Sequence, residues 1–196
     1  YRGWNPALGS DHIHQGHHGT PVAGMIGAAW HNGTGGTGVA PHIKMMVVAG
    51  GSQTEAEAIE AYDYVLNQRL LYNDTQGEKG AFVVATNTSW GVNGLHPAAA
   101  PVWCQFYDQL GEAGILNCAA TANANWDIDE VGDMPTACSS PYLIAVTASN
   151  RMDERTGAFG PATIDFAAPG EEVFTTQPGS EYGWSSGTSF ASPIAA

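Results

Sequence analysis

The segment Gly187-Thr188-Ser189-Phe190-Ala191-Ser192-Pro193 is reached through YGWSS at residues 182–186. The glycine permits a sharp backbone turn, and threonine is a residue type that caps helices, so a helix is expected to begin at Thr188. Ser189 then lies in the first turn, where free backbone N–H groups can stabilise the oxyanion formed when a serine attacks a carbonyl. Ser189 is therefore a candidate nucleophile, and a plain helix cap is the alternative.

A histidine that can act as the partner base stands near the other end of the sequence. Residues 16–27, GHHGTPVAGMIG, place His18 directly before a Gly-Thr pair and before small and apolar residues at helical spacing. The pattern predicts a buried helix with His18 at its exposed start. A nucleophilic serine needs such a base within hydrogen-bond reach.

Both segments resemble the motifs of one family. HGT at 18–20 followed by VAG at 22–24, and GTS at 187–189 followed by Ala191 and Pro193, are similar to the His and Ser motifs of subtilisin-like serine proteases. The resemblance runs from about residue 16 to 196 and implies a partial subtilisin-like peptidase domain over 1–196, truncated at both ends. It implies a serine endopeptidase that works through an acyl-enzyme intermediate, with Ser189 as nucleophile and His18 as general acid and base.

The family's third catalytic group, an aspartate from a strand before the histidine, has no counterpart here. Asp11 lies only seven residues before His18, in a loop without the family's glycine, and does not fit this role. We expect the aspartate upstream of Tyr1, and the fragment alone to be inactive without it. A catalytically inactive protease-like domain used for binding or scaffolding is the alternative. An unrelated α/β hydrolase is disfavoured, because that fold places its serine before its histidine.

Further site residues follow from the resemblance. Asn123 ends an apolar strand at the place where the family carries the side-chain donor of its oxyanion hole, beside the Ser189 backbone N–H; Asn125 is the alternative. The segment Ser89-Trp90-Gly91 corresponds to the edge that pairs with the substrate backbone, which implies recognition of extended peptides. Trp90 narrows a subsite there or simply packs.

Metal binding is considered at two loops. In the family, a glycine-rich loop like residues 30–41 commonly holds calcium, which prefers oxygen ligands; the positions here are Trp30, Asn32, Thr34 and Gly36, and a plain flexible loop is the alternative. The other group is His12, His14, His17 and His18, which we interpret as ordinary loop histidines, since the His-Glu-x-x-His helix of zinc proteases is absent. The resemblance implies that the reaction requires no cofactor. The metal ion that it implies is a structural calcium ion.

Composition restricts the partners. The 196 residues, 43% hydrophobic and 13% charged, are typical of one globular domain, and a formal charge of −13 disfavours a nucleic-acid or anionic-membrane partner. No apolar run reaches the roughly 18 residues of a membrane span. We expect a monomeric, secreted or cell-surface enzyme whose partner is a polypeptide substrate. Three cysteines leave at least one that is free or pairs outside the chain, and the sequence does not decide whether Cys104 or Cys118 pairs with Cys138.

Short apolar runs alternate with helical patterns along the sequence. Strands are expected at 43–49, 81–86, 115–121, 142–147, 163–167 and 173–176, and helices at 53–72 and 97–112. Residues 1–17 are polar and aperiodic, which predicts a loop, and the DFAAPG segment at 165–170 resembles a family landmark with a structural role. Strands separated by helices imply a doubly wound, mostly parallel α/β sheet flanked by helices, with ligands beyond the carboxyl ends of the strands.

Overall fold

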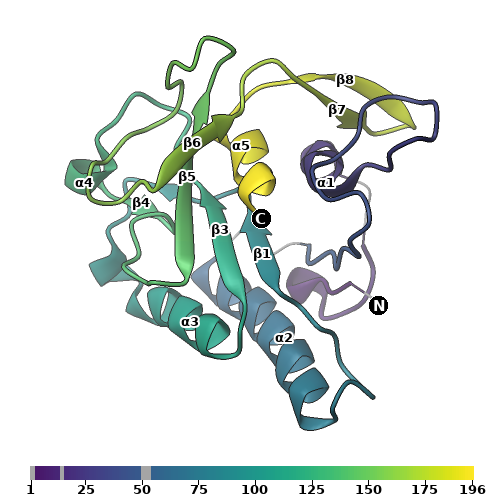
Figure 1. Ribbon diagram of the computed structural model, residues 1–196. Coiled ribbons are helices and arrows are strands. Elements are labelled where there is room, and N and C mark those ends of the chain that lie inside the picture. The colour runs from purple at the N-terminus through teal and green to yellow at the C-terminus, as the bar shows by residue number, and fades with distance from the viewer. Residues whose placement is uncertain (1–2, 14–15, 50–53) are drawn as a thin grey trace.

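A four-stranded parallel sheet forms the centre of the computed structural model, which describes residues 3–13, 16–49 and 54–196 (Figure 1). Its spatial order is β1-β3-β5-β6. The strands are β1 (Ala85–Thr88), β3 (Leu116–Ala120), β5 (Leu143–Ser149) and β6 (Phe166–Pro169). Thr88 lies opposite Ala119, and Ala120 opposite Val146. The predicted parallel α/β fold is confirmed.

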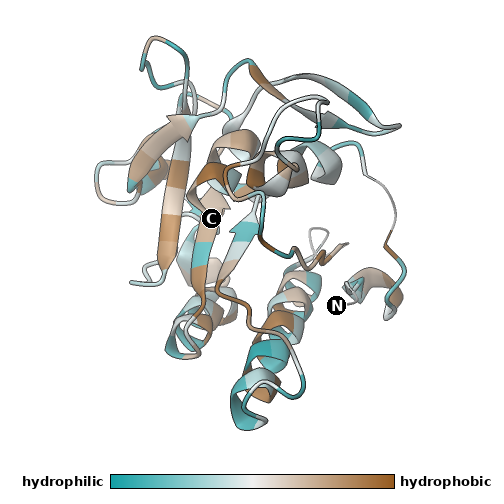
Figure 2. Ribbon diagram, turned by 45° about the vertical axis from the view of Figure 1, so that its right-hand side comes forward, coloured by the Kyte–Doolittle hydropathy of each residue, from teal (hydrophilic) through white to brown (hydrophobic). Residues whose placement is uncertain are grey.

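Helices cover both faces of this sheet. Helices α2 (Glu55–Asp74) and α3 (Pro101–Glu112) pack around Leu143 of β5, whereas α5 (Thr188–Ala195) packs on Val146 and Ala148. Odd and even positions of β5 thus serve opposite cores, as the two-residue period of a strand requires. Figure 2 shows hydrophobic colour along the central strands and both colours on α2.

The run at 173–176 forms a strand, but not in the central sheet. Strand β7 (Val173–Gln177) pairs antiparallel with β8 (Glu181–Ser185), which was not predicted; positive φ values at Gly179 and Ser180 close the tight turn between them. Helix α1 (Gly19–Gly27), predicted after His18, packs on this ribbon (Figure 1). Hydroxyls of β7 donate to carbonyls of the first turn of α1, which fixes the helix beside α5.

The strand predicted at 43–49 is wrong in extent. Only Val48 forms a bridge, parallel to Trp4, supported by hydrogen bonds from Trp4 N to Val47 O (3.0 Å) and from Ala49 N to Trp4 O (2.8 Å). The apolar run predicted extended backbone, but a strand also needs a partner along its length, and the described residues supply one only at Trp4.

The buried face of helix α2 includes a charged residue. Tyr62, Leu66 and Arg69 are buried, whereas Leu70 is 41% exposed. The guanidinium donates to the carbonyls of Val83 and Gly114, which compensates its burial. The expected first residue of this helix, at position 53, lies outside the described residues.

The remaining elements are short. Residues 1–17 were predicted as loop, but the 3₁₀ turn η1 (Pro6–Leu8) lies within them; His14 is outside the described residues. The helix predicted from 97 divides into η2 (Pro97–Ala99) and α3. The others are β2 (Val92–Asn93), β4 (Asp133–Met134) and α4 (Ile128–Val131). Among the described residues, no helix is both long and apolar enough to cross a membrane.

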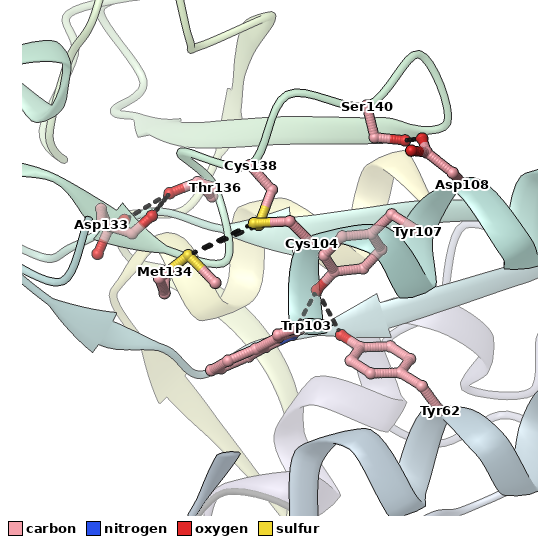
Figure 3. Close-up of a disulfide and its surroundings, with 10 residues drawn as sticks. All are labelled: Tyr62, Trp103, Cys104, Tyr107, Asp108, Asp133, Met134, Thr136, Cys138 and Ser140. Carbon is pink, nitrogen blue, oxygen red and sulfur yellow. Dashed lines mark hydrogen bonds between the residues drawn. A yellow bond between two sulfur atoms is a disulfide. The ribbon is translucent and has the colours of Figure 1, made fainter. Parts of the chain in front are cut away.

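Cys104 and Cys138 form a disulfide that joins α3 to the loop after β4 (Figure 3). Cys118 is free and buried in β3. Burial, and secondarily the charge of Asp165, raise the pKa of its thiol to about 11. A thiol with so high a pKa is a poor nucleophile, consistent with a packing role for Cys118.

Candidate active site

A cleft of about 300 Å³ opens where β1 and β3 end and α5 begins. It is lined by residues 89–91, Asn93, residues 120–123, Thr188 and Ser189. The carboxyl ends of parallel strands meet at one edge of a sheet, and polar side chains that follow them converge there. The cleft therefore brings together Ser189, Asn123 and the Ser89-Trp90-Gly91 segment, three of the predicted site features.

Ser189 lies at the start of α5 and is held by Ser89. Its hydroxyl donates to the Ser89 carbonyl oxygen at 3.0 Å, and the Ser89 hydroxyl donates to the Ser189 carbonyl oxygen at 2.8 Å. Asn87 completes the arrangement, because its amide donates to Ser89 Oγ and its oxygen accepts from Ser192 Oγ. These contacts fix the first turn of α5 against the end of β1.

Asn123 presents its amide nitrogen to the cleft. Its Oδ1 accepts from the Thr188 backbone N–H at 2.8 Å and from Thr188 Oγ1 at 3.1 Å. Since the oxygen must face these donors, Nδ2 points away from them and can donate to a ligand. By contrast, Asn125, the alternative, accepts from Arg155 Nη2 at 2.8 Å and does not line the cleft.

Thr188 does not cap α5 as expected. The N-cap is Gly187 with φ 141°, and it provides no side-chain cap. Thr188 Oγ1 instead lies 2.5 Å from the carbonyl oxygen of Thr121, to which it donates, across the end of β3. Thr188 thus positions Asn123 relative to Ser189, a role that only the tertiary structure reveals.

His18 occupies the predicted position at the start of α1, beside α5. Its ring centroid lies 6.1 Å from that of Phe190, the residue after Ser189. Partial burial of the imidazole lowers the pKa of His18 below its ordinary value, so the neutral form that can accept a proton is favoured. In the described part of the chain the Ser189 hydroxyl bonds to Ser89 rather than to His18, and Asp11 is exposed.

The Ser89-Trp90-Gly91 segment borders the cleft. Trp90 lines the cleft and also packs on Trp103, with ring centroids 5.6 Å apart. A Cβ on Gly91 would lie 2.2 Å from the Met134 carbonyl oxygen. Position 91 therefore needs glycine because β4 passes so close.

The glycine-rich loop proposed for calcium is held by its own contacts. Asn32 Oδ1 accepts from the Thr34 backbone N–H at 3.1 Å, Thr34 Oγ1 accepts from Tyr182 at 3.3 Å, and Trp30 packs edge-on against His31. The loop sequence contains no carboxylate, so its donor set fits calcium only through amide, hydroxyl and backbone oxygens. The described residues contain no group of three or more His, Cys, Asp or Glu that could hold a metal ion.

Asp133 supports two residues of the cleft wall, Thr121 and Ala122, a role that sequence reasoning missed. It is 2% exposed, and its Oδ2 accepts from Thr121 Oγ1 at 2.9 Å and from Ala122 N at 3.0 Å. Oδ2 also accepts from Thr136 Oγ1 at 2.5 Å, the contact that Figure 3 shows. Burial raises the pKa of this carboxyl above its ordinary value, although the three hydrogen bonds oppose the rise. A carboxylate surrounded by apolar residues in the sequence was the one available signal.

Known proteins are similar to this chain in sequence and in fold. The chain is 29% identical to thermitase of Thermoactinomyces vulgaris over 182 residues, covering 90% of this chain and 57% of thermitase. It is 31% identical to the minor extracellular protease Epr of Bacillus subtilis, covering 91% of this chain and 25% of Epr. A solved cold adapted subtilisin-like serine proteinase superposes with a TM-score of 0.72 at 23% identity, covering 98% and 63% of the two chains.

The chain thus spans less than two thirds of the length of each of these relatives. Its sequence matches the family described as the Subtilase family over residues 4–196, a range that contains the His18 helix, both strand ends at the cleft and the Ser189 helix. The chain belongs to the subtilase family of serine peptidases.

Proposed function

We propose that the protein is a serine endopeptidase that hydrolyses peptide bonds through an acyl-enzyme intermediate. The observation that carries the proposal is the convergence of Ser189 and Asn123 on one cleft, with His18 on the helix packed against α5. Ser189 attacks the peptide carbonyl while His18 takes its proton and then gives it to the leaving amine. Asn123 Nδ2 and the Ser189 backbone N–H donate to the oxyanion, and water then releases the acyl group.

The substrate is proposed to bind as an extended peptide along the Ser89-Trp90-Gly91 segment. For attack, the Ser189 hydroxyl must turn from the Ser89 carbonyl toward His18. We propose that residues 1–196 are part of one peptidase domain. We also propose that the protein is a monomer and is secreted, as the name of its relative Epr, a minor extracellular protease, suggests. We also propose a calcium site at Trp30, Asn32, Thr34 and Gly36, because the corresponding loop of the family commonly holds calcium. Since this loop contains no carboxylate, the ligands would be amide, hydroxyl and backbone oxygens.

A binding module without peptidase activity is the second candidate. The observation that favours it is the engagement of the Ser189 hydroxyl with Ser89 instead of His18. The full-length protein separates the two candidates. A serine-directed fluorophosphonate should label Ser189, and casein hydrolysis should disappear in Ser189→Ala. A folded protein that neither takes up the label nor cleaves casein would establish the binding module.

A further inference from the structure

Two elements hold the segment that carries Asn123, the proposed side-chain donor of the oxyanion hole. From α5, Thr188 donates its backbone N–H and its hydroxyl to Asn123 Oδ1. From β4, Asp133 holds the two residues that come directly before Asn123. Its Oδ2 accepts from Thr121 Oγ1 at 2.9 Å and from the Ala122 backbone N–H at 3.0 Å. The position of the Asn123 amide therefore depends on both sides, because α5 holds the side chain and β4 holds the backbone from which it extends.

Asp133 lies in a turn that is anchored to the rest of the fold (Figure 3). Its carbonyl oxygen accepts from the Ala137 backbone N–H at 2.7 Å and from Thr136 Oγ1 at 3.3 Å, and Thr136 Oγ1 also donates to Oδ2. Cys138, the next residue of the turn, is joined by the disulfide to Cys104 of α3. Because the turn has its own hydrogen bonds and a covalent link to a helix, it holds the Asp133 carboxylate in a fixed place.

The groups that Asp133 accepts from in the cleft wall depend on it. Within residues 3–13, 16–49 and 54–196, neither the Thr121 hydroxyl nor the Ala122 backbone N–H donates to another acceptor. Both residues are 4% exposed, so water has little access to these donors. A buried donor that loses its acceptor costs free energy, and the chain lowers that cost by moving the donor toward water or another acceptor. Loss of the carboxylate is therefore expected to displace this segment, and Asn123 with it because Asn123 follows directly.

We propose that Asp133 is a positioning residue for catalysis, which places the Asn123 amide where the oxyanion forms. This inference rests on the proposed peptidase function, because the oxyanion arises only when Ser189 attacks a carbonyl. Asp133 does not line the cleft, so it acts through Asn123 and not on the substrate. A donor of the oxyanion hole stabilises the transition state only within about 2.7–3.1 Å of the oxyanion, so a small displacement of the amide removes most of its contribution.

The test is a double-mutant cycle in the full-length protein, with one fluorogenic peptide amide as substrate. Asp133→Ala should lower kcat by about ten- to hundredfold with little change in KM. In the Asn123→Ala background the same change should lower kcat by less than about threefold, because the donor that Asp133 positions is already absent. Titration of Ser189 with a fluorophosphonate gives the concentration of competent enzyme in each sample. A loss of folded protein is therefore not counted as a loss of kcat.

Asp133→Asn keeps an oxygen that can accept from the wall, so its kcat should exceed that of Asp133→Ala by about fivefold or more. If Asp133→Ala does not fold, Thr121→Val takes its place in the cycle, because it removes one donor and leaves the carboxylate.

The matched control is Asp165→Ala, which removes a carboxylate that accepts from the Ala145 backbone N–H at 2.8 Å, in β5 and away from the cleft. Its kcat should match wild type. Equal losses of kcat from Asp133→Ala in the two backgrounds, or a loss that Asp165→Ala shares, would overturn the inference and leave the peptidase function standing. A folded wild type that cleaves no peptide would overturn the peptidase function and the inference with it.

Discussion

Ser189 and Ser89, one hundred residues apart in the chain, exchange hydrogen bonds, each hydroxyl donating to the other's backbone carbonyl at 3.0 and 2.8 Å. The exchange joins the first turn of α5 to the end of β1. The serine that attacks is thereby fixed beside the segment along which the substrate is proposed to bind. Both are buried, at 9% and 6% exposure, so the hydrogen bonds are protected from competing water.

Ser89→Ala should weaken this attachment. The change removes the donor to the Ser189 carbonyl and the acceptor of Asn87, so the free energy of unfolding should fall by about 1–2 kcal/mol. Labelling of Ser189 by a fluorophosphonate should also slow, because the helix start is less well fixed. Ser185→Ala on the β7–β8 ribbon is the matched control. Equal stability and labelling rates in the two variants would show that the exchange does not position Ser189.

Asn123→Ala should lower kcat by about two to three orders of magnitude, a value that comes from a member of this family, with little change in KM. The reason is that Nδ2 is the side-chain donor left free at the cleft once Thr188 holds Oδ1. Asn125→Ala should change kcat by less than a few-fold, since its oxygen accepts from Arg155. Steady-state kinetics on one peptide amide would decide. A larger loss in Asn125→Ala would assign the oxyanion donor to the other asparagine.

The sequence pattern around each residue was enough to predict the positions of most candidate site residues. Asn123 and Ser89 each follow a strand that reads as a short apolar run, and parallel strands gather whatever follows them at one edge. His18 precedes one helix and Ser189 lies in the first turn of another, and the pattern of each helix is visible within a few residues. Such features depend on near neighbours in the chain, which is why the sequence predicts them.

Other features depend on which surfaces meet. The run at 43–49 has strand composition, yet it lacks a partner beyond Trp4. Arg69 displaces Leu70 from the buried face of α2 because the carbonyls of Val83 and Gly114 lie within its reach. The burial of Asp133 likewise depends on donors from Thr121 and Ala122, which no local pattern identifies. Long-range pairing decided each of these outcomes.

Reduction of the Cys104–Cys138 disulfide should destabilise the fold. The bridge closes a loop with a sequence separation of 34, and opening a loop of that size lowers the free energy of unfolding by about 4 kcal/mol in the chain-entropy account. Thermal unfolding with and without dithiothreitol measures the effect. Cys118→Ala should remain sensitive to the reductant, whereas the double variant Cys104→Ser, Cys138→Ser should not respond. Wild type that unfolds identically in both conditions would contradict the prediction.

The pH dependence of stability tests the burial of the Asp133 carboxyl. Burial raises its pKa in the folded state above the ordinary 3.8. Between 3.8 and the raised value, the unfolded chain has lost this proton while the folded chain keeps it. Rising pH therefore favours the unfolded state, and the contribution of Asp133 to stability falls through this window. Asparagine does not titrate, so Asp133→Asn should gain stability relative to wild type as the pH rises from below 3.8 toward neutrality.

Urea unfolding of both proteins at several pH values between about 3.5 and 7 measures this difference, and Asp63→Asn corrects for the general effect of removing one negative charge. A difference that stays flat or shrinks with rising pH would show that burial does not penalise the charged carboxyl. A difference that grows would show that burial penalises the charged form of this carboxyl, which the hydrogen bonds from Thr121, Ala122 and Thr136 only partly offset.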